Sequence, residues 1–100
     1  MLTGKHSPIH PGEVLWSEFM KPLGINKSRL AQATRMPTDR VGKLVRGERR
    51  FTADTCLRLA RYLGTSAEFW MNLQARHDLD AARDELGETI RAEIEPRGVA

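Results

Sequence analysis

The stretch Asn26–Gly47, NKSRLAQATRMPTDRVGKLVRG, decides the fold of this 100-residue chain. Wound at about 100° per residue, each half gathers its apolar side chains on one side, which is typical of an amphipathic helix. The two apolar stripes are Leu30, Ala31 and Thr34 within residues 27–35, and Val41, Leu44 and Val45 within residues 38–46. Only a few residues separate the two helices, so the stretch predicts a helix-turn-helix.

Local chemistry sets the ends of both helices. The Asn26 side chain can accept a hydrogen bond from a free amide of the first turn, so it caps the first helix. Pro37 disfavours helical geometry at the residue before it and lacks an amide proton, so it separates the helices and can open the second one. Gly47 supplies the left-handed conformation that ends the second helix.

Charge is distributed unevenly along the chain, although the net charge is only +3. Residues 1–50 carry ten Lys and Arg against four acids, whereas residues 51–100 carry six against nine. The surplus of the first half falls within residues 27–50, where there are eight basic residues and two acids. A solvated helix surface would explain scattered charges, but a basic surround of a helix-turn-helix favours binding to the phosphates of a nucleic acid.

The other periodic segments extend the helix-turn-helix into a single all-α domain of five helices. A first helix begins near Pro11 and is expected to end at Pro22 and Gly24. A fourth helix runs from the N-cap Thr52 to the C-terminal stop Gly64. The predicted organisation is a flexible arm at residues 1–9, a DNA-binding domain at residues 10–86 that contains the helix-turn-helix at 26–47, and a tail at residues 87–100 that is partly extended or disordered.

The long fifth helix, which a capping box at Thr65–Glu68 opens, is apolar on two sides. One side, with Phe69, Trp70, Leu73 and His77, would close the core. The other side recurs at spacings of three and four residues and consists of Met71, Ala75, Leu79, Ala82, Leu86 and Ile90. A helix that is apolar on both sides must bury both. We therefore predict a homodimer in which this second side packs against the same helix of another copy.

The segment after Gly87 supports two interpretations. Leu86, Ile90 and Ile94 continue the helical spacing, whereas Ile90, Ala92 and Ile94 also alternate as in a short strand. The glycine and the β-branched side chains favour an extended segment, paired across the dimer. Disorder is expected beyond Pro96.

Composition and spacing argue against several other classes of protein. No run of about 18 apolar residues is present and the N-terminus lacks the apolar core of a signal peptide, so a cytoplasmic protein without a membrane partner is expected. The lone Cys56 lies at helical spacing with apolar residues of the fourth helix, so it is expected to be a core residue. Ser7-Pro8 disfavours a helix between His6 and His10, which would be needed to place both on one metal. No metal or cofactor is expected. Because the histidines and acids do not converge, we expect no enzyme activity.

Further motifs closely resemble the HigA-type antitoxins, a branch of the Xre and lambda-repressor-like class of DNA-binding proteins. The matching motifs are His10–Glu13, Lys21–Gly24, Thr52–Thr55 and Phe69–Leu73, and the likeness spans His10 to Leu79. The resemblance implies a five-helix domain that dimerises and binds a palindromic operator in its own promoter. It also implies that the protein neutralises a HigB-like toxin, an endoribonuclease that cuts messenger RNA.

The resemblance, together with the exposed face of the second helix, assigns roles to individual residues. Thr38, Asp39 and Lys43 would read base edges in the major groove of operator DNA. Residues at the helix starts, the flanks and the following loop would contact the DNA backbone: Lys27, Ser28, Gln32, Arg35, Arg40, Arg46, Arg49 and Arg50. Gly42 would either let the helix approach the groove closely or have no role at an exposed site.

Arg35 departs from the class, which usually has glycine at this point of the turn. A left-handed conformation costs a non-glycine residue about 1 kcal/mol. Either the turn is relaxed, or Arg35 is strained in order to contact a phosphate.

Two other functions remain open from the sequence. A stand-alone repressor of the Xre class would share the helix-turn-helix but have no toxin partner. A protein-binding module would keep the fold without gripping DNA, and a salt-sensitive gel shift with its own promoter separates that case from repression.

Overall fold

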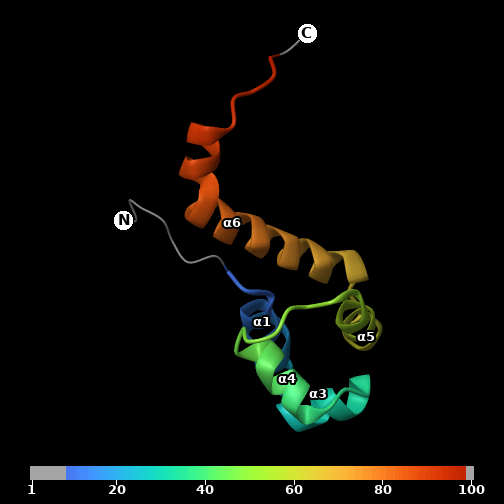
Figure 1. Ribbon diagram of the computed structural model, residues 1–100. Helices are drawn as coiled ribbons and strands as arrows, with labels where there is room; N and C mark the ends of the chain where they lie inside the picture. Colours follow the sequence, from blue (N-terminus) through green and yellow to red (C-terminus); the bar gives the residue numbers. More distant parts are fainter. Residues whose placement is uncertain (1–8, 99–100) are drawn as a thin grey trace.

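The computed structural model describes residues 9–98, and within them the chain forms five helices and no strand (Figure 1). The elements are α1 (Pro11–Val14), η1 (Leu15–Met20), α2 (Lys21–Leu23), α3 (Lys27–Thr34), α4 (Thr38–Val45), α5 (Ala53–Leu63) and α6 (Ala67–Glu93). The first three follow one another without a break and make one helix. The predicted all-α, five-helix fold is confirmed, and α3 and α4 are the helix-turn-helix.

The first helix includes Pro22 and ends at Leu23, so of the two predicted stops only Gly24 acts as one. The preceding segment, η1, is a π-helix, in which the Lys21 amide donates to the carbonyl of Trp16, five residues back. An α-helix would need an amide proton at Pro22 directed at Glu18, and the wider π turns accommodate its absence. Gly24, with φ at 67°, then ends the helix as expected.

The core lies where α1, α4, α5 and the first turns of α6 meet, and Trp70 is its largest fully buried side chain. The Trp70 ring stacks on Phe51 with 5.7 Å between centroids, and Phe19 lies 5.2 Å away. The indole NH of Trp70 donates to the Thr65 hydroxyl at 2.7 Å. A buried tryptophan thereby satisfies its one polar atom, and Thr65 is occupied by this bond. The N-cap of α6 is the next residue, Ser66, and not Thr65 as predicted.

The predicted strand after Gly87 is wrong, because α6 continues to Glu93. The amide of Ile94 still donates to the carbonyl of Ile90 at 2.8 Å, and residues 94–98 have no regular structure. An extended segment would depend on a strand of another copy for its backbone groups, because residues 9–98 contain no strand. Helix propagation satisfies those groups within the segment, which outweighs the weak β propensity of its residues. The predicted arm, apart from Ile9, lies outside the described residues.

Gly12 lets α1 lie directly on the C-terminal end of α4. A Cβ atom at this position would overlap the carbonyl oxygen of Leu44 and lie 2.9 Å from that of Val45. Both Gly12 and its neighbour Pro11 are buried. At Gly12, α1 and α4 therefore meet through backbone atoms.

His10 caps α1 in a crowded place. Its Nδ1 accepts a hydrogen bond from the Gly12 amide at 3.0 Å, and its ring lies edge-on to His77 with 4.8 Å between centroids. Burial lowers the pKa of His10 below 6.5, and His77 and Arg50 lower it further, against the opposing charges of Glu13 and Asp78. The neutral ring is thus the form that the fold stabilises.

Stability is expected to decrease as the pH falls below 6.5, because unfolded His10 then takes up a proton that the folded protein resists. The contribution is fully present above pH 6.5 and is lost as the pH falls through the lower pKa of the folded state. Thermal unfolding at a series of pH values measures the effect. His10→Asn is the control, since its side-chain oxygen can accept the same bond without titrating. An equally steep decrease in this variant would contradict the assignment to His10.

Candidate nucleic-acid interface

The helix-turn-helix is held by the residues that the sequence analysis placed on its inner face. Leu30, Ala31, Val41 and Leu44 are buried. The Asn26 side chain accepts from the Arg29 amide at 2.8 Å, which confirms it as the N-cap of α3. Pro37 precedes the first residue of α4 as its N-cap. These contacts leave the outer faces of α3 and α4 to the solvent.

Arg35 adopts the left-handed conformation, with φ at 59° and ψ at 41°, so the turn is not relaxed. It is the one residue other than glycine with positive φ among residues 9–98. The chain reverses tightly here, because the Met36 amide donates to the Ala31 carbonyl at 3.0 Å and Met36 is buried. The tight closure imposes a backbone conformation that glycine adopts more readily. Whether the Arg35 side chain contacts a phosphate stays a prediction.

Arg35→Gly is expected to stabilise the fold by about 0.5–1 kcal/mol, because the left-handed strain exceeds the entropy that glycine adds to the unfolded chain. Urea unfolding measures the change. The control is Arg35→Ala, which removes the same side chain but retains a Cβ atom, and no such gain is expected from it. Equal stabilisation by both variants would assign the effect to the charge of the side chain and not to the backbone.

The three predicted base readers lie on the outer part of α4, but not all of them point freely into solvent. Thr38 and Asp39 are exposed, whereas Lys43 is half-buried. The Lys43 ammonium lies 3.4 Å from the Asp39 carboxylate, one helical turn away. Exposed ion pairs of this kind are weak, so a base edge can compete for either partner.

Gly42 lies beneath the Arg46 side chain and is buried, contrary to the expectation of an exposed site. A Cβ atom there would lie 3.1 Å from Nη1 of Arg46. The guanidinium of Arg46 also donates to both Glu48 carboxylate oxygens, at 3.1 and 3.2 Å. This hydrogen bonding raises the pKa of Arg46 and lowers that of Glu48. Gly42 therefore makes room for an arginine that covers it.

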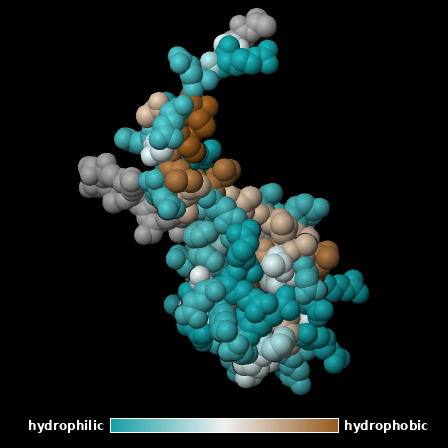
Figure 2. Space-filling view, viewed as in Figure 1, coloured by the Kyte–Doolittle hydropathy of each residue, from teal (hydrophilic) through white to brown (hydrophobic). Residues whose placement is uncertain are grey.

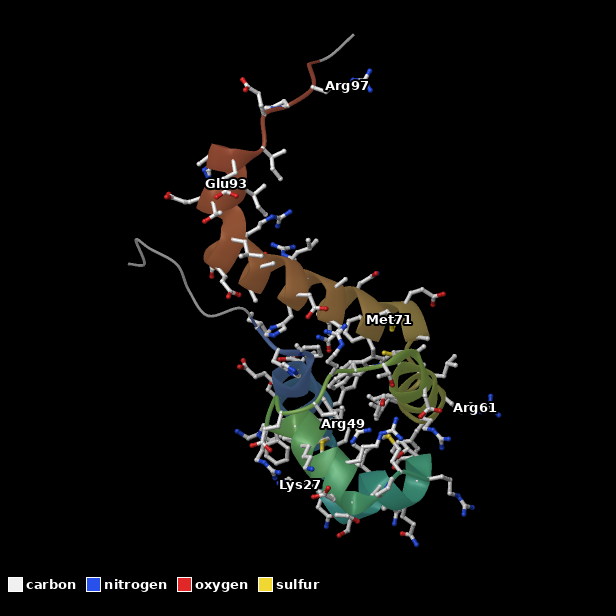
Figure 3. All side chains as sticks on the ribbon, in the orientation of Figure 1. Lys27, Arg49, Arg61, Met71, Glu93 and Arg97 are labelled. Carbon is white, nitrogen blue, oxygen red and sulfur yellow. The ribbon has the colours of Figure 1, made fainter. Side chains whose placement is uncertain are left out.

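Seven of the eight predicted DNA-backbone residues are exposed. Lys27 begins α3 and Arg49 lies in the loop between α4 and α5 (Figure 3). Within the described chain, neither side chain has an ion pair with an acid. Arg50 does, because its guanidinium lies 2.9 Å from the carboxylate of Asp78 on α6. The exposed set consists of Lys27, Ser28, Gln32, Arg35, Arg46, Arg49 and Arg50.

Arg40 does not belong with this set. Its side chain is only 18% exposed and its Nη2 donates to Asp54 at 2.7 Å and to the Thr55 hydroxyl at 2.6 Å. An arginine held in this way faces α5, and its contact with the DNA backbone stays a prediction. The sequence analysis placed Arg40 among the helix starts, flanks and loop that would contact the DNA backbone, but it could not show that α5 would lie against this side chain.

Gln74 is a structural residue that the sequence analysis did not single out. It is buried in α6, where its side-chain oxygen accepts the Phe51 amide at 2.8 Å and its nitrogen donates to Asp78 at 3.0 Å. Phe51 is itself buried. The basic loop after α4 is thereby fixed to α6 at two points, Gln74 and Asp78. Gln74 follows Trp70 by four residues, and this spacing is the sequence signal that Gln74 faces inwards.

The second apolar side of α6 is uncovered, as the sequence predicted. Met71, Leu79, Leu86 and Ile90 are each between 40% and 51% exposed, and Ala75 and Ala82 are exposed with them. Figure 2 shows hydrophobic side chains gathered on the distal part of α6, while the surface over the helix-turn-helix is largely hydrophilic. Met71 lies in the first part of α6, which begins at Ala67, and Glu93 is at its far end, which extends beyond the rest of the domain (Figures 1 and 3).

Residues 9–98 contain neither a membrane-spanning helix nor a metal-ligand cluster. None of their helices has both the length and the apolar character needed to cross a membrane. In the same residues, no three His, Cys, Asp or Glu side chains come together as metal ligands would.

Comparison with known proteins gives consistent matches. The Helix-turn-helix family matches residues 17–70. Antitoxin HigA-1 of Vibrio cholerae is 37% identical over 87 residues, which are 87% of this chain and 82% of that protein. The antitoxin HigA of Pseudomonas aeruginosa, solved with the higBA promoter, is 44% identical with a TM-score of 0.88, covering 91% of this chain and 99% of that one. A P. aeruginosa protein solved with its 18-bp operator DNA is 43% identical with a TM-score of 0.90, and the match covers 96% of this chain and 100% of that one.

Proposed function

Because this chain belongs to the helix-turn-helix family, in its branch of HigA antitoxins, we propose that it binds operator DNA in its own promoter, represses that promoter and neutralises a HigB-like RNase toxin. One observation carries the DNA-binding part. Thr38 and Asp39 on the outer face of α4 are solvent-exposed and Lys43 is half-buried, within a basic surround, in a chain that closely matches a HigA antitoxin solved with promoter DNA. Acting on DNA would place the protein in the cytoplasm.

Docking follows from the faces of α4. The inner face is buried through Val41 and Leu44, so only the outer face can enter a major groove. There the Lys43 ammonium can donate to guanine, the Asp39 carboxylate can accept from cytosine, and Thr38 can use its hydroxyl or methyl group. The exposed basic residues of α3 and of the loop after α4 would hold the DNA backbone on either side.

Lys43→Ala is expected to reduce discrimination at one base pair by about 1–3 kcal/mol, because it removes a base contact. Arg49→Ala is expected to weaken binding to all sequences alike and to lower the salt slope of log K by about one, because it removes a phosphate contact. Titration of both variants with the promoter and with single-base-pair variants, at several salt concentrations, separates the two roles. Equal losses of discrimination would contradict this division.

The uncovered side of α6 supports a homodimer, which a palindromic operator requires. A two-fold dimer presents its two reading helices about 34 Å apart, one turn of DNA. Footprinting on the promoter is expected to show two protected half-sites related by two-fold symmetry. Protection of a single asymmetric site would count against this dimer.

The antitoxin role is tested through the neighbouring gene. Co-expression of the adjacent short reading frame with this chain, followed by purification of one tagged partner, is expected to yield a stable complex and cells that grow. Toxicity of the frame alone is the control. A chain that binds its promoter but forms no complex would be a stand-alone repressor of the same class, the second candidate function.

A further inference from the structure

One carboxylate, that of Asp54 in the first turn of α5, connects the reading helix to the turn that precedes it. On one side Asp54 accepts from Arg40 of α4 at 2.7 Å. On the other side it accepts from Nε of Arg58 at 3.0 and 3.1 Å. The Nη1 atom of Arg58 in turn donates to the carbonyl oxygens of Thr34 and Arg35, at 3.0 and 3.3 Å. Asp54 thus contacts α4 directly through Arg40 and is joined to the turn through Arg58.

We propose that Asp54 is a positioning residue for sequence recognition, which fixes the rotation of α4 through Arg40 and the left-handed turn through Arg58. The inference rests on the proposed DNA-binding function and adds to it a residue that touches no base. Arg40 follows Asp39 directly in α4, so any rotation of the helix about its axis moves both. A base contact depends on donor and acceptor meeting at hydrogen-bond distance, so a small rotation of α4 changes all three predicted readers together.

The surroundings of these groups favour orientation over stability as their role. The Asp54 side chain is 55% exposed, and exposed ion pairs add little to the free energy of unfolding. Arg40, in contrast, is largely covered and shares its Nη2 with the Thr55 hydroxyl, whose residue is buried. The hydrogen bonds from Arg40 and Arg58 hold the pKa of Asp54 below its usual value, so the carboxylate is charged at neutral pH. A charged carboxylate with two fixed arginine partners restricts the orientation of α4 and of the turn even where it adds little to the free energy of unfolding.

Asp54→Asn is the test. Asparagine keeps the shape of the side chain but has no negative charge and only one acceptor oxygen, so it cannot accept charge-assisted hydrogen bonds from both arginines. Operator and single-base-pair variants are titrated at several salt concentrations, and thermal unfolding is measured alongside. We expect discrimination between operator and variants to fall by about tenfold, the order of one lost base contact. The salt slope and the melting temperature are expected to stay near those of the unsubstituted protein, since no phosphate contact is removed.

The matched control is Asp80→Asn, which breaks a similar carboxylate–arginine pair with Arg76 on α6, at 3.1 and 3.3 Å. This variant is expected to discriminate like the unsubstituted protein. Unchanged discrimination in Asp54→Asn, or an equal loss in Asp80→Asn, would overturn the proposal. An unsubstituted protein that does not prefer its promoter would instead refute the proposed function, and the inference would fall with it.

Arg58→Lys decides the question if Asp54→Asn does not fold. Lysine keeps a positive charge beside Asp54 but cannot span the carboxylate and two carbonyl oxygens as the guanidinium does. A folded Arg58→Lys protein with about tenfold weaker discrimination supports the positioning role. This loss is again of the order of one base contact. Discrimination equal to that of the unsubstituted protein overturns it.

Discussion

Replacing Gly12 with alanine is expected to destabilise the fold by about 3 kcal/mol or more, at the upper end of what overpacking costs. The added Cβ atom would overlap the Leu44 carbonyl oxygen and crowd that of Val45. Backbone atoms cannot turn aside as a flexible side chain can, so α1 would have to separate from α4. Urea unfolding followed by circular dichroism measures the change.

Gly87→Ala is the matched control, because the same substitution meets no atom within 4 Å inside α6. Alanine favours the helix by about 0.8–1 kcal/mol over glycine, so this variant is expected to be more stable than the unsubstituted protein. The same chemical change should thus have opposite signs at the two positions. A Gly12→Ala protein as stable as the unsubstituted one would show that α1 does not lie on α4 as described.

Leu79→Glu combined with Leu86→Glu is expected to convert the dimer to a monomer and to weaken operator binding by about 100-fold or more, since two linked reading helices bind far more tightly than one. Both leucines lie on the uncovered side of α6, 51% and 45% exposed. A charge on each copy would face its counterpart across the two-fold axis without a partner. Light scattering measures the mass, and titration with the promoter measures the affinity.

Leu57→Glu is the control for this pair, because Leu57 is 63% exposed but lies on α5. It removes an apolar side chain of the same type from a different surface, and its mass and operator affinity are expected to be unchanged. A double variant that stays dimeric, or a Leu57→Glu protein that dissociates, would place the dimer interface elsewhere.

The helix-turn-helix could be predicted because its signals are local. Helical spacing identified Leu30, Val41 and Leu44 as inward-facing, and the capping role of Asn26 depends only on neighbouring amides. The exposed stripe of α6 followed from spacing in the same way. The left-handed Arg35 was one of two alternatives, and the closure of the turn between Ala31 and Met36 decides between them.

The features that sequence reasoning missed depend on contacts between distant segments. Arg40 was assigned only to the DNA backbone, and its pairing with Asp54, fourteen residues on, depends on the packing of α5 against α4. Gly12 carries no periodic signal, because the need for glycine there comes from the backbone of α4, which packs directly against it. The tail was mistaken for a strand because β-branched residues weigh locally, whereas the absence of a pairing strand is a property of the whole described domain.

The two tryptophans of the chain occupy opposite surroundings, which gives the protein two separate fluorescent reporters. Trp70 is fully buried, so its emission should shift to longer wavelength only when the fold opens. Trp16 is 42% exposed and lines a shallow depression with Lys27 and Ser28 at the start of α3. Iodide should quench Trp16 alone in the folded protein, and bound DNA should shield it. Trp16→Phe keeps only the folding reporter and Trp70→Phe only the binding reporter, so each process can be followed separately without a label.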